Sequence, residues 1–66
     1  DVTEERARLT KEIQEVEAYL KRLDAKLSNE QFRSRAPRDV VAAEEQRQAD
    51  ARARLAGLRR ALEELG

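Results

Sequence analysis

The chain has 66 residues, of which 42% are charged and 39% hydrophobic, and its 14 basic residues balance its 14 acidic ones. A chain this short buries a modest fraction of its surface, which excludes a thick globular core. It contains no Cys and no His, so disulfides, thiolate metal sites and the commonest general base are excluded as well.

Two sequence features that direct a chain to or across a membrane are a long apolar run and a secretory signal. No apolar run approaches the roughly 20 residues that cross a bilayer, and no secretory signal opens the sequence. We therefore expect a cytoplasmic protein with no membrane partner. Because the chain starts at Asp1 rather than Met, we also expect it to be a piece of something larger.

The first predicted helix spans about residues 3–27 and has apolar residues at spacings of three and four. We assign heptad position a to Val2, Leu9, Val16 and Leu23. Position d then falls to Arg6, Ile13, Leu20 and Leu27. Only Arg6 breaks this stripe, and its long stem can lie along the seam with the charge in water.

The predicted turn covers about residues 28–36. Ser28 and Gln31 have the spacing of a capping box, which predicts a short helical turn over residues 29–34. Pro37 disfavours helix at Ala36 and suits the first turn of a new helix. We expect Phe32 to close the end of the seam, against Leu27 and Val40 or Val41.

The second predicted helix spans about residues 37–65. Position a is assigned to Val41, Gln48, Leu55 and Leu62. Position d is assigned to Glu44, Ala51, Leu58 and Leu65. The seam is therefore apolar towards the C-terminus and thin around Glu44, Gln48 and Ala51.

A short connection between two striped helices predicts an all-α fold, an antiparallel coiled-coil hairpin forming a single arm. One long helix that dimerises with another chain is the alternative, and Pro37 argues against it. Aligning Leu27 with Val41 predicts the following layers: Leu23 with Glu44, Leu20 with Gln48, Val16 with Ala51, Ile13 with Leu55, and Leu9 with Leu58.

This alignment predicts two ordinary ion pairs across the seam and one like-charge contact. These are Lys21 with Glu45, Glu15 with Arg54, and Arg22 with Arg47, the last offset in part by Glu44, which is close in sequence to Arg47. The like-charge contact lies on a flank where three cations, all without an evident partner, adjoin an aromatic ring and small apolar residues: Tyr19, Arg22, Lys26, Val40, Ala43 and Arg47. Such a surface suits RNA, because cations hold phosphates and a flat apolar platform accepts a base.

The charge distribution agrees with this interpretation. Residues 21–38 carry six basic and two acidic side chains, a net charge of +4, so the rest of the chain carries −4. The basic tip adds Arg33, Arg35 and Arg38 as secondary candidates for RNA binding. The simpler explanation is that charged coiled-coil faces are solvated, that Tyr19 is an ordinary surface residue, and that the tip arginines complement loop carbonyls or keep the tip soluble.

The turn and its flanks carry a recognisable motif. Residues 26–41 read KLSNEQFRSRAPRDVV, which resembles the pattern K-L-[SA]-[NS]-x-x-F-x-x-[KR]-A-P-x-x-V-V in the C-terminal arm of valyl-tRNA synthetases. The resemblance extends over essentially the whole chain, because heptads of similar length flank the motif.

The resemblance implies that the chain is the C-terminal fragment of a valine–tRNA ligase, with tRNA and the rest of the synthetase as partners. In that family the arm reaches the outer corner, or elbow, of tRNA, where the D- and T-loops meet. The resemblance points to the same flank: it implies that Arg22 and Arg47 bind tRNA, with Tyr19, Val40 and Ala43 as the apolar platform. Aminoacylation, with ATP and Mg²⁺, is expected in other domains. The fragment has no phosphate-cradling loop, metal cluster or nucleophile–base pair, so we expect it to have no catalytic residue, metal or cofactor.

A different class of function is also consistent with the sequence. The chain could be a structural or protein-interaction coiled coil, such as an oligomerisation segment or the tail hairpin of an ABC-type ATPase. We expect a monomer, with a dimer or a domain-swapped dimer as the alternative.

Overall fold

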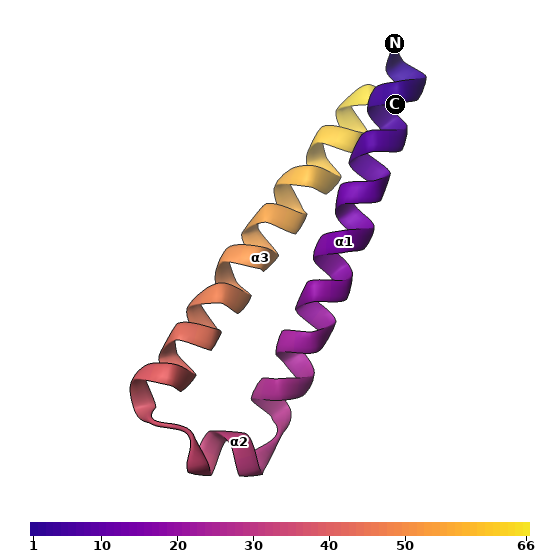
Figure 1. Cartoon of the computed structure of the whole chain (residues 1–66). Coiled ribbons are helices and arrows are strands. Elements are labelled where there is room, and N and C mark those ends of the chain that lie inside the picture. The colour runs from indigo at the N-terminus through magenta and orange to yellow at the C-terminus, as the bar shows by residue number, and fades with distance from the viewer.

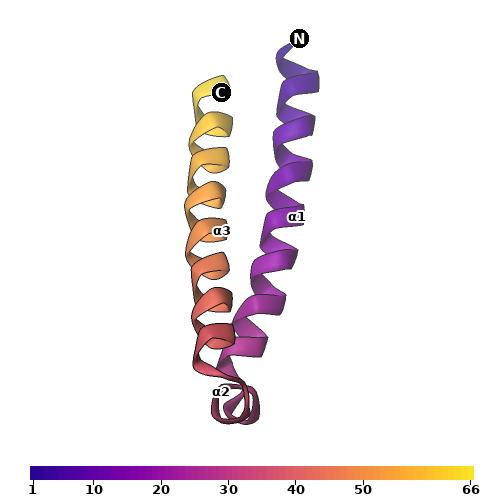
Figure 2. The ribbon, with the colours of Figure 1, turned by 60° about the vertical axis from the view of Figure 1, so that its left-hand side comes forward.

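The computed structural model describes all 66 residues as three helices: α1 (Val2–Ser28), α2 (Glu30–Arg35) and α3 (Arg38–Leu65). α1 and α3 run side by side in opposite directions, and α2 crosses between them at the end remote from both termini (Figures 1 and 2). The molecule measures 49 × 14 × 12 Å. The predicted all-α hairpin is confirmed. None of the three helices combines the length and the apolarity that a membrane span requires.

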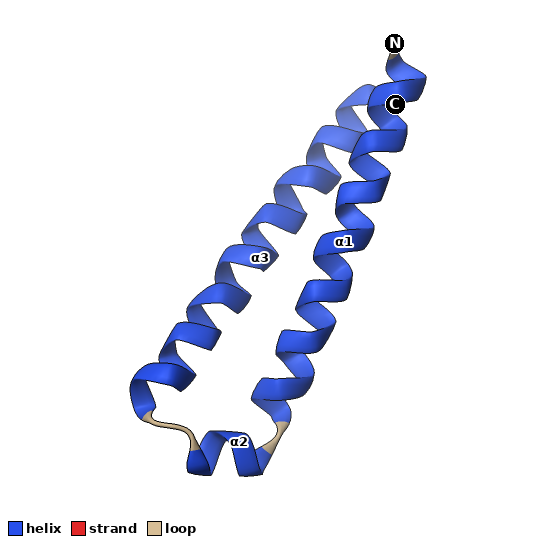
Figure 3. Ribbon diagram, in the orientation of Figure 1, coloured by secondary structure: helices blue, strands red, loops and turns tan.

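Asn29 makes the first corner of the hairpin. Its backbone is extended, and its side chain accepts hydrogen bonds from the backbone N–H groups of Gln31 (2.9 Å) and Phe32 (3.4 Å). The predicted capping box is therefore wrong, because Ser28 is the last residue of α1 and its hydroxyl donates to the carbonyl of Asp24. An extended Ala36 followed by Pro37 makes the second corner, so only two short joints separate the helices (Figure 3).

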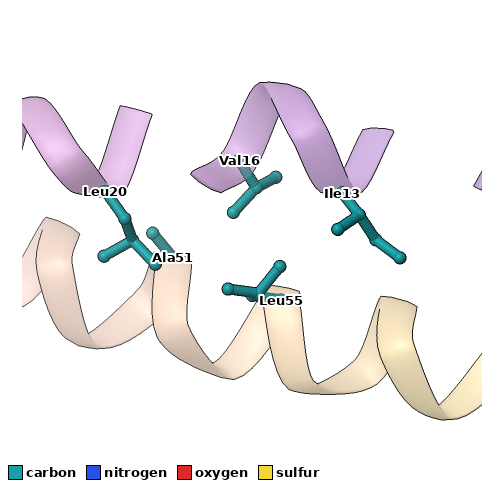
Figure 4. Close-up of a cluster of buried hydrophobic side chains, with 5 residues drawn as sticks. All are labelled: Ile13, Val16, Leu20, Ala51 and Leu55. Carbon is teal, nitrogen blue, oxygen red and sulfur yellow. The ribbon is translucent and has the colours of Figure 1, made fainter. Parts of the chain in front are cut away.

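The apolar seam is centred on five buried residues: Ile13, Val16, Leu20, Ala51 and Leu55. Leu20 lies beside Ala51, and Val16 lies over Leu55 (Figure 4). We expected Gln48 opposite Leu20 and Ala51 opposite Val16. In the structure each of these α1 residues instead meets the next seam residue of α3 towards the C-terminus.

The cause of this error is the heptad assignment of α1. Position d follows position a by three residues, whereas the assignment above placed Arg6 four residues after Val2. Exchanging the two letters puts Ile13 and Leu20 at a and Val16 at d. Because the two helices run in opposite directions, each residue at position a of one helix then meets a residue at position d of the other, as Leu20 meets Ala51.

The ion pairs along one edge of the seam agree with the exchanged letters. Arg59 pairs with Glu17 at 2.6 Å, and Arg52 pairs with Asp24 at 3.4 Å. All four residues occupy position e once α1 is relabelled, as an antiparallel pair requires. The expected pairs of Lys21 with Glu45 and of Glu15 with Arg54 do not form.

The apolar seam is interrupted towards the tip. Leu23 and Leu27 of α1 are buried, but they lie outside the apolar cluster. The relabelled seam sets Gln48 and Glu44 of α3 opposite them, and the Gln48 amide donates to the carboxylate of Asp24. The thin seam expected at these positions is therefore present, and polar contacts fill it.

The register predicts which charges are energetically coupled. Replacing Glu17 and Arg59 by Ala, singly and together, should give a coupling free energy of about 0.2–1 kcal/mol in thermal unfolding followed by circular dichroism, because the pair is partly exposed. The same cycle on Glu15 and Arg54 serves as the matched control and should give no coupling. Coupling in the second cycle and none in the first would contradict this register.

Candidate nucleic-acid interface

The six candidate residues of the interface lie on one side of the hairpin. After the relabelling of α1, Tyr19 and Lys26 occupy position g, together with Val40 and Arg47 of α3. Arg22 and Ala43 occupy the adjoining position c. We call these six residues the g flank: Tyr19, Arg22, Lys26, Val40, Ala43 and Arg47. Relabelling α1 exchanges positions g and c for Tyr19, Arg22 and Lys26. Because positions g and c are neighbours on a helix surface, the six residues still lie on one flank.

The g flank exposes apolar surface. Three large hydrophobic side chains are exposed in the whole chain, and two of them, Tyr19 and Val40, belong to this flank at 38% and 40% exposure. Tyr19 lines a groove together with the guanidinium of Arg47. An aromatic ring held at the surface next to a guanidinium can stack on a nucleobase while the cation binds phosphate.

A shallow groove of about 390 Å³ runs along the seam next to Tyr19. Val16 and Ala51 form its floor, while Tyr19 of α1 and Arg47 of α3 line its walls. The small side chain of Ala51 leaves this space, because a leucine at the same d position would fill it. The remaining lining residues carry charge: Glu12, Glu15, Asp50 and Arg54.

The groove therefore joins two electrostatically different regions. Tyr19 and Arg47 belong to its basic side, and three carboxylates line it as well. A polyanion is attracted by the first region and repelled by the second. This contrast limits the favourable surface to the half of the arm that lies between the groove and the tip.

Two of the three cations on the flank have a partner, contrary to the sequence-based expectation. Arg47 pairs with Glu44 one turn earlier in α3, and Lys26 of α1 approaches the other oxygen of the same carboxylate at 3.6 Å. Arg22 alone forms no ion pair. Under the corrected labelling Arg22 lies at position c, outside the seam, so the argument that it faces Arg47 across the g edge no longer applies.

The tip contains a second set of contacts. The ammonium of Lys26 lies 4.9 Å from the centre of the half-buried Phe32 ring, within the range of a cation–π interaction. Arg33 donates to the last-turn carbonyl of Leu27 at 3.1 Å and to the carboxylate of Glu45 at 3.3 Å. Arg33 therefore joins the end of α1 to the start of α3.

The three tip arginines differ in consequence. Arg33 has two partners within the hairpin, whereas Arg35 and Arg38 are exposed and form no ion pair. The latter two present their full charge to solvent. The simpler explanation offered for the tip arginines, that they complement loop carbonyls, applies to Arg33 with one change: its acceptor is a carbonyl in the last turn of α1.

The sequence indicated Glu44 as a partial counter-charge for Arg47, but Glu44 was not predicted to belong to the site. The available signal was a carboxylate at a d position, where an apolar residue is expected.

The only resolved shift in pKa lies away from the flank: a hydrogen bond and charge attraction from Glu5 raise the pKa of Arg8, with Glu12 adding to the effect.

Comparison with known proteins agrees with the motif at the turn. The model of the family described as the valyl tRNA synthetase tRNA binding arm matches residues 1–66, the whole chain. The chain belongs to this family. The resemblance to valyl-tRNA synthetases seen in residues 26–41 is confirmed.

Valine–tRNA ligases from several bacteria match the chain over almost its full length. The protein from Agrobacterium fabrum is 50% identical over 62 residues, which cover 94% of this chain and 6% of the relative. The protein from Christiangramia forsetii is 42% identical over 98% of this chain and 7% of its own length. The arm thus spans a small fraction of the relatives it matches. No solved structure gives a significant match.

The contacts of the tip predict different effects for neighbouring arginines. Arg33→Ala should lower the free energy of unfolding by about 1 kcal/mol, because two hydrogen bonds between α2 and its neighbours are lost. The matched control, Arg35→Ala, should leave stability nearly unchanged. Thermal unfolding followed by circular dichroism measures both, and equal effects of the two substitutions would contradict a structural role for Arg33.

Proposed function

We propose that this chain is the tRNA-binding arm of a valine–tRNA ligase and that its g flank contacts the elbow of tRNA. In this proposal the other domains of the enzyme carry out aminoacylation, using ATP and Mg²⁺, and the arm assists by holding the tRNA. The observation that carries the proposal is the set of cations beside exposed apolar side chains on one flank, in a chain of the tRNA binding arm family.

The cations of the flank suit phosphate binding. The side chains of Arg47 and Lys26 are 59% and 48% exposed even though both pair with Glu44. A guanidinium has five N–H donors, so Arg47 keeps donors for an RNA backbone after one nitrogen has bound the carboxylate. Arg22 has no competing partner at all, which makes it the strongest candidate for phosphate contact.

The apolar part of the flank suits an exposed base rather than a duplex groove. Sequence-tolerant RNA contacts use aromatic rings, because every base has a π-face to stack on. The elbow of tRNA presents such a face at the end of a stack of tertiary base pairs, and Tyr19, Val40 and Ala43 would pack against it. An elbow contact would serve most tRNAs equally, so valine specificity would come from elsewhere in the enzyme.

The structural alternative, an oligomerisation segment, draws less support from the structure. It relied on the thin seam at Glu44, Gln48 and Ala51 as a place for a second copy. Glu44 and Gln48 instead find their polar partners within the hairpin. We accordingly propose that the arm acts without a second copy.

Charge reversal on the flank tests the electrostatic part of the proposal. Arg22→Glu combined with Arg47→Glu should weaken binding of valine tRNA by roughly tenfold or more at low salt. It should also reduce the slope of log Kd against log salt concentration by about one to two, because fewer phosphate contacts release counterions. Fluorescence anisotropy of labelled tRNA, titrated at several salt concentrations, measures both quantities.

A control with the same change in charge is available at the stem, the end of the hairpin that carries both termini. Lys11 and Arg60 are exposed, form no ion pair and occupy the outward position f. Lys11→Glu combined with Arg60→Glu should therefore weaken binding much less than the flank variant. Equal losses in the two variants would mean that net charge, and not the flank, governs binding.

The stacking contact is tested separately from charge. Tyr19→Ala should weaken binding of folded tRNA roughly fivefold or more, the lower end of the range for a base–aromatic contact, and Tyr19→Phe should retain it because the ring remains. A tRNA whose D- and T-loop contact is disrupted should bind both variants alike. The elbow assignment fails if Tyr19→Ala weakens binding of the disrupted tRNA by the same factor.

A further inference from the structure

Glu44 is a buried carboxylate at a position where the heptad calls for an apolar side chain. It is the only charged residue of the chain that is buried, at 7% exposure. Burial of a charge is unfavourable unless partners compensate for the lost hydration. The apolar cluster stops short of it, although Leu23 and Leu27 of α1 are buried nearby. Glu44 therefore weakens the seam at this point.

The two partners of Glu44 come from different helices, and both belong to the g flank. One carboxylate oxygen accepts from Arg47 of α3, and the other faces the ammonium of Lys26 of α1 at 3.6 Å. The ammonium of Lys26 also lies 4.9 Å from the centre of the Phe32 ring. A single buried group thus links two half-exposed cations across the seam.

We propose that Glu44 is a positioning residue of the RNA interface, which holds Arg47 and Lys26 in a fixed arrangement beside Tyr19. This inference rests on the proposed function and adds a specific role for a residue that touches no RNA itself. Long cationic side chains lose much conformational freedom on binding. A buried acceptor restricts that freedom before the RNA arrives, which improves selectivity for one arrangement of phosphates.

A positioning role for Glu44 can be distinguished from a role in stability or in net charge, because the carboxylate also has an electrostatic cost. The negative charge of Glu44 lowers the attraction of the flank for any polyanion. Removing the charge should therefore strengthen binding of arbitrary RNA while the ordered arrangement that suits tRNA is lost. A residue that only added stability or only tuned charge would change both kinds of binding in the same direction.

A double-mutant cycle tests the inference. Glu44→Gln, Arg47→Ala and the double variant are titrated with a valine tRNA transcript and with a simple RNA hairpin that has no elbow. Glu44→Gln should weaken tRNA binding roughly three- to tenfold, which is within the range for coupled neighbouring residues, and should not weaken binding of the hairpin. In the Arg47→Ala background the Glu44 substitution should have a much smaller effect on tRNA. Glu63→Gln, at an exposed carboxylate of the stem without an ion pair, is the control for charge.

Stability provides a readout that does not depend on RNA. Glu44→Leu should raise the melting temperature by a few degrees, since a leucine extends the apolar seam and both cations can be solvated. A fall in the melting temperature would overturn the view that Glu44 weakens the seam.

The outcomes separate this inference from the function on which it rests. If Arg47→Ala weakens tRNA binding but Glu44→Gln does not, or if Glu44→Gln acts equally in both backgrounds, the positioning role is wrong and the proposed function stands. If the wild-type chain does not bind tRNA, or if neither Arg47→Ala nor the charge-reversed flank variant affects binding, both are overturned.

Discussion

Two apolar stripes that can be buried only against each other determine the form of this molecule. Neither helix has enough neighbours to be stable alone, because isolated helices gain little from propensity and depend on packing. Asn29 and Pro37 close the connection into two tight corners around α2, so α3 returns along α1. Everything on the surface follows from that return, since it decides which residues of the two helices become neighbours.

The return also makes the two edges of the seam chemically different. Opposite charges pair across the e edge, as Glu17 pairs with Arg59. The g edge instead brings Tyr19 and Arg47 to the walls of one groove. An edge closed by ion pairs supports the hairpin, and an edge with exposed ring and guanidinium groups is available for a partner. Under the proposed function, the e edge stabilises the hairpin and the g edge recognises the RNA.

Glu44 lies where these two tasks conflict. An apolar residue there would complete the seam and leave Arg47 and Lys26 free on the surface. The carboxylate interrupts the seam and binds both cations. Among the tip arginines the same division recurs, because Arg33 joins helix ends while Arg35 and Arg38 remain exposed. The arginines of this arm therefore differ in their contacts, and the sequence alone does not distinguish those with a partner in the hairpin from those without one.

The sequence predicted the main features of the fold and of the candidate flank. Spacings of three and four indicated both helices, Pro37 indicated the break, and residues 26–41 indicated the family. The error in the heptad letters of α1 changed the expected partners of Leu20 and Val16 and both expected ion pairs across the seam. It left the flank intact, because Tyr19 and Arg22 lie on the same side of the helix under either labelling.

Local pattern alone determined that this chain forms two helices, where they break and which faces are apolar, because these properties depend on residues within a few positions of one another. The tertiary structure decided which residues meet across the seam. An offset of a few residues leaves both stripes buried, so hydrophobicity barely distinguishes the alternatives, whereas specific contacts such as Arg52 with Asp24 do. It also decided that Glu44 holds Lys26, a partner 18 positions away in sequence, which no local pattern could indicate.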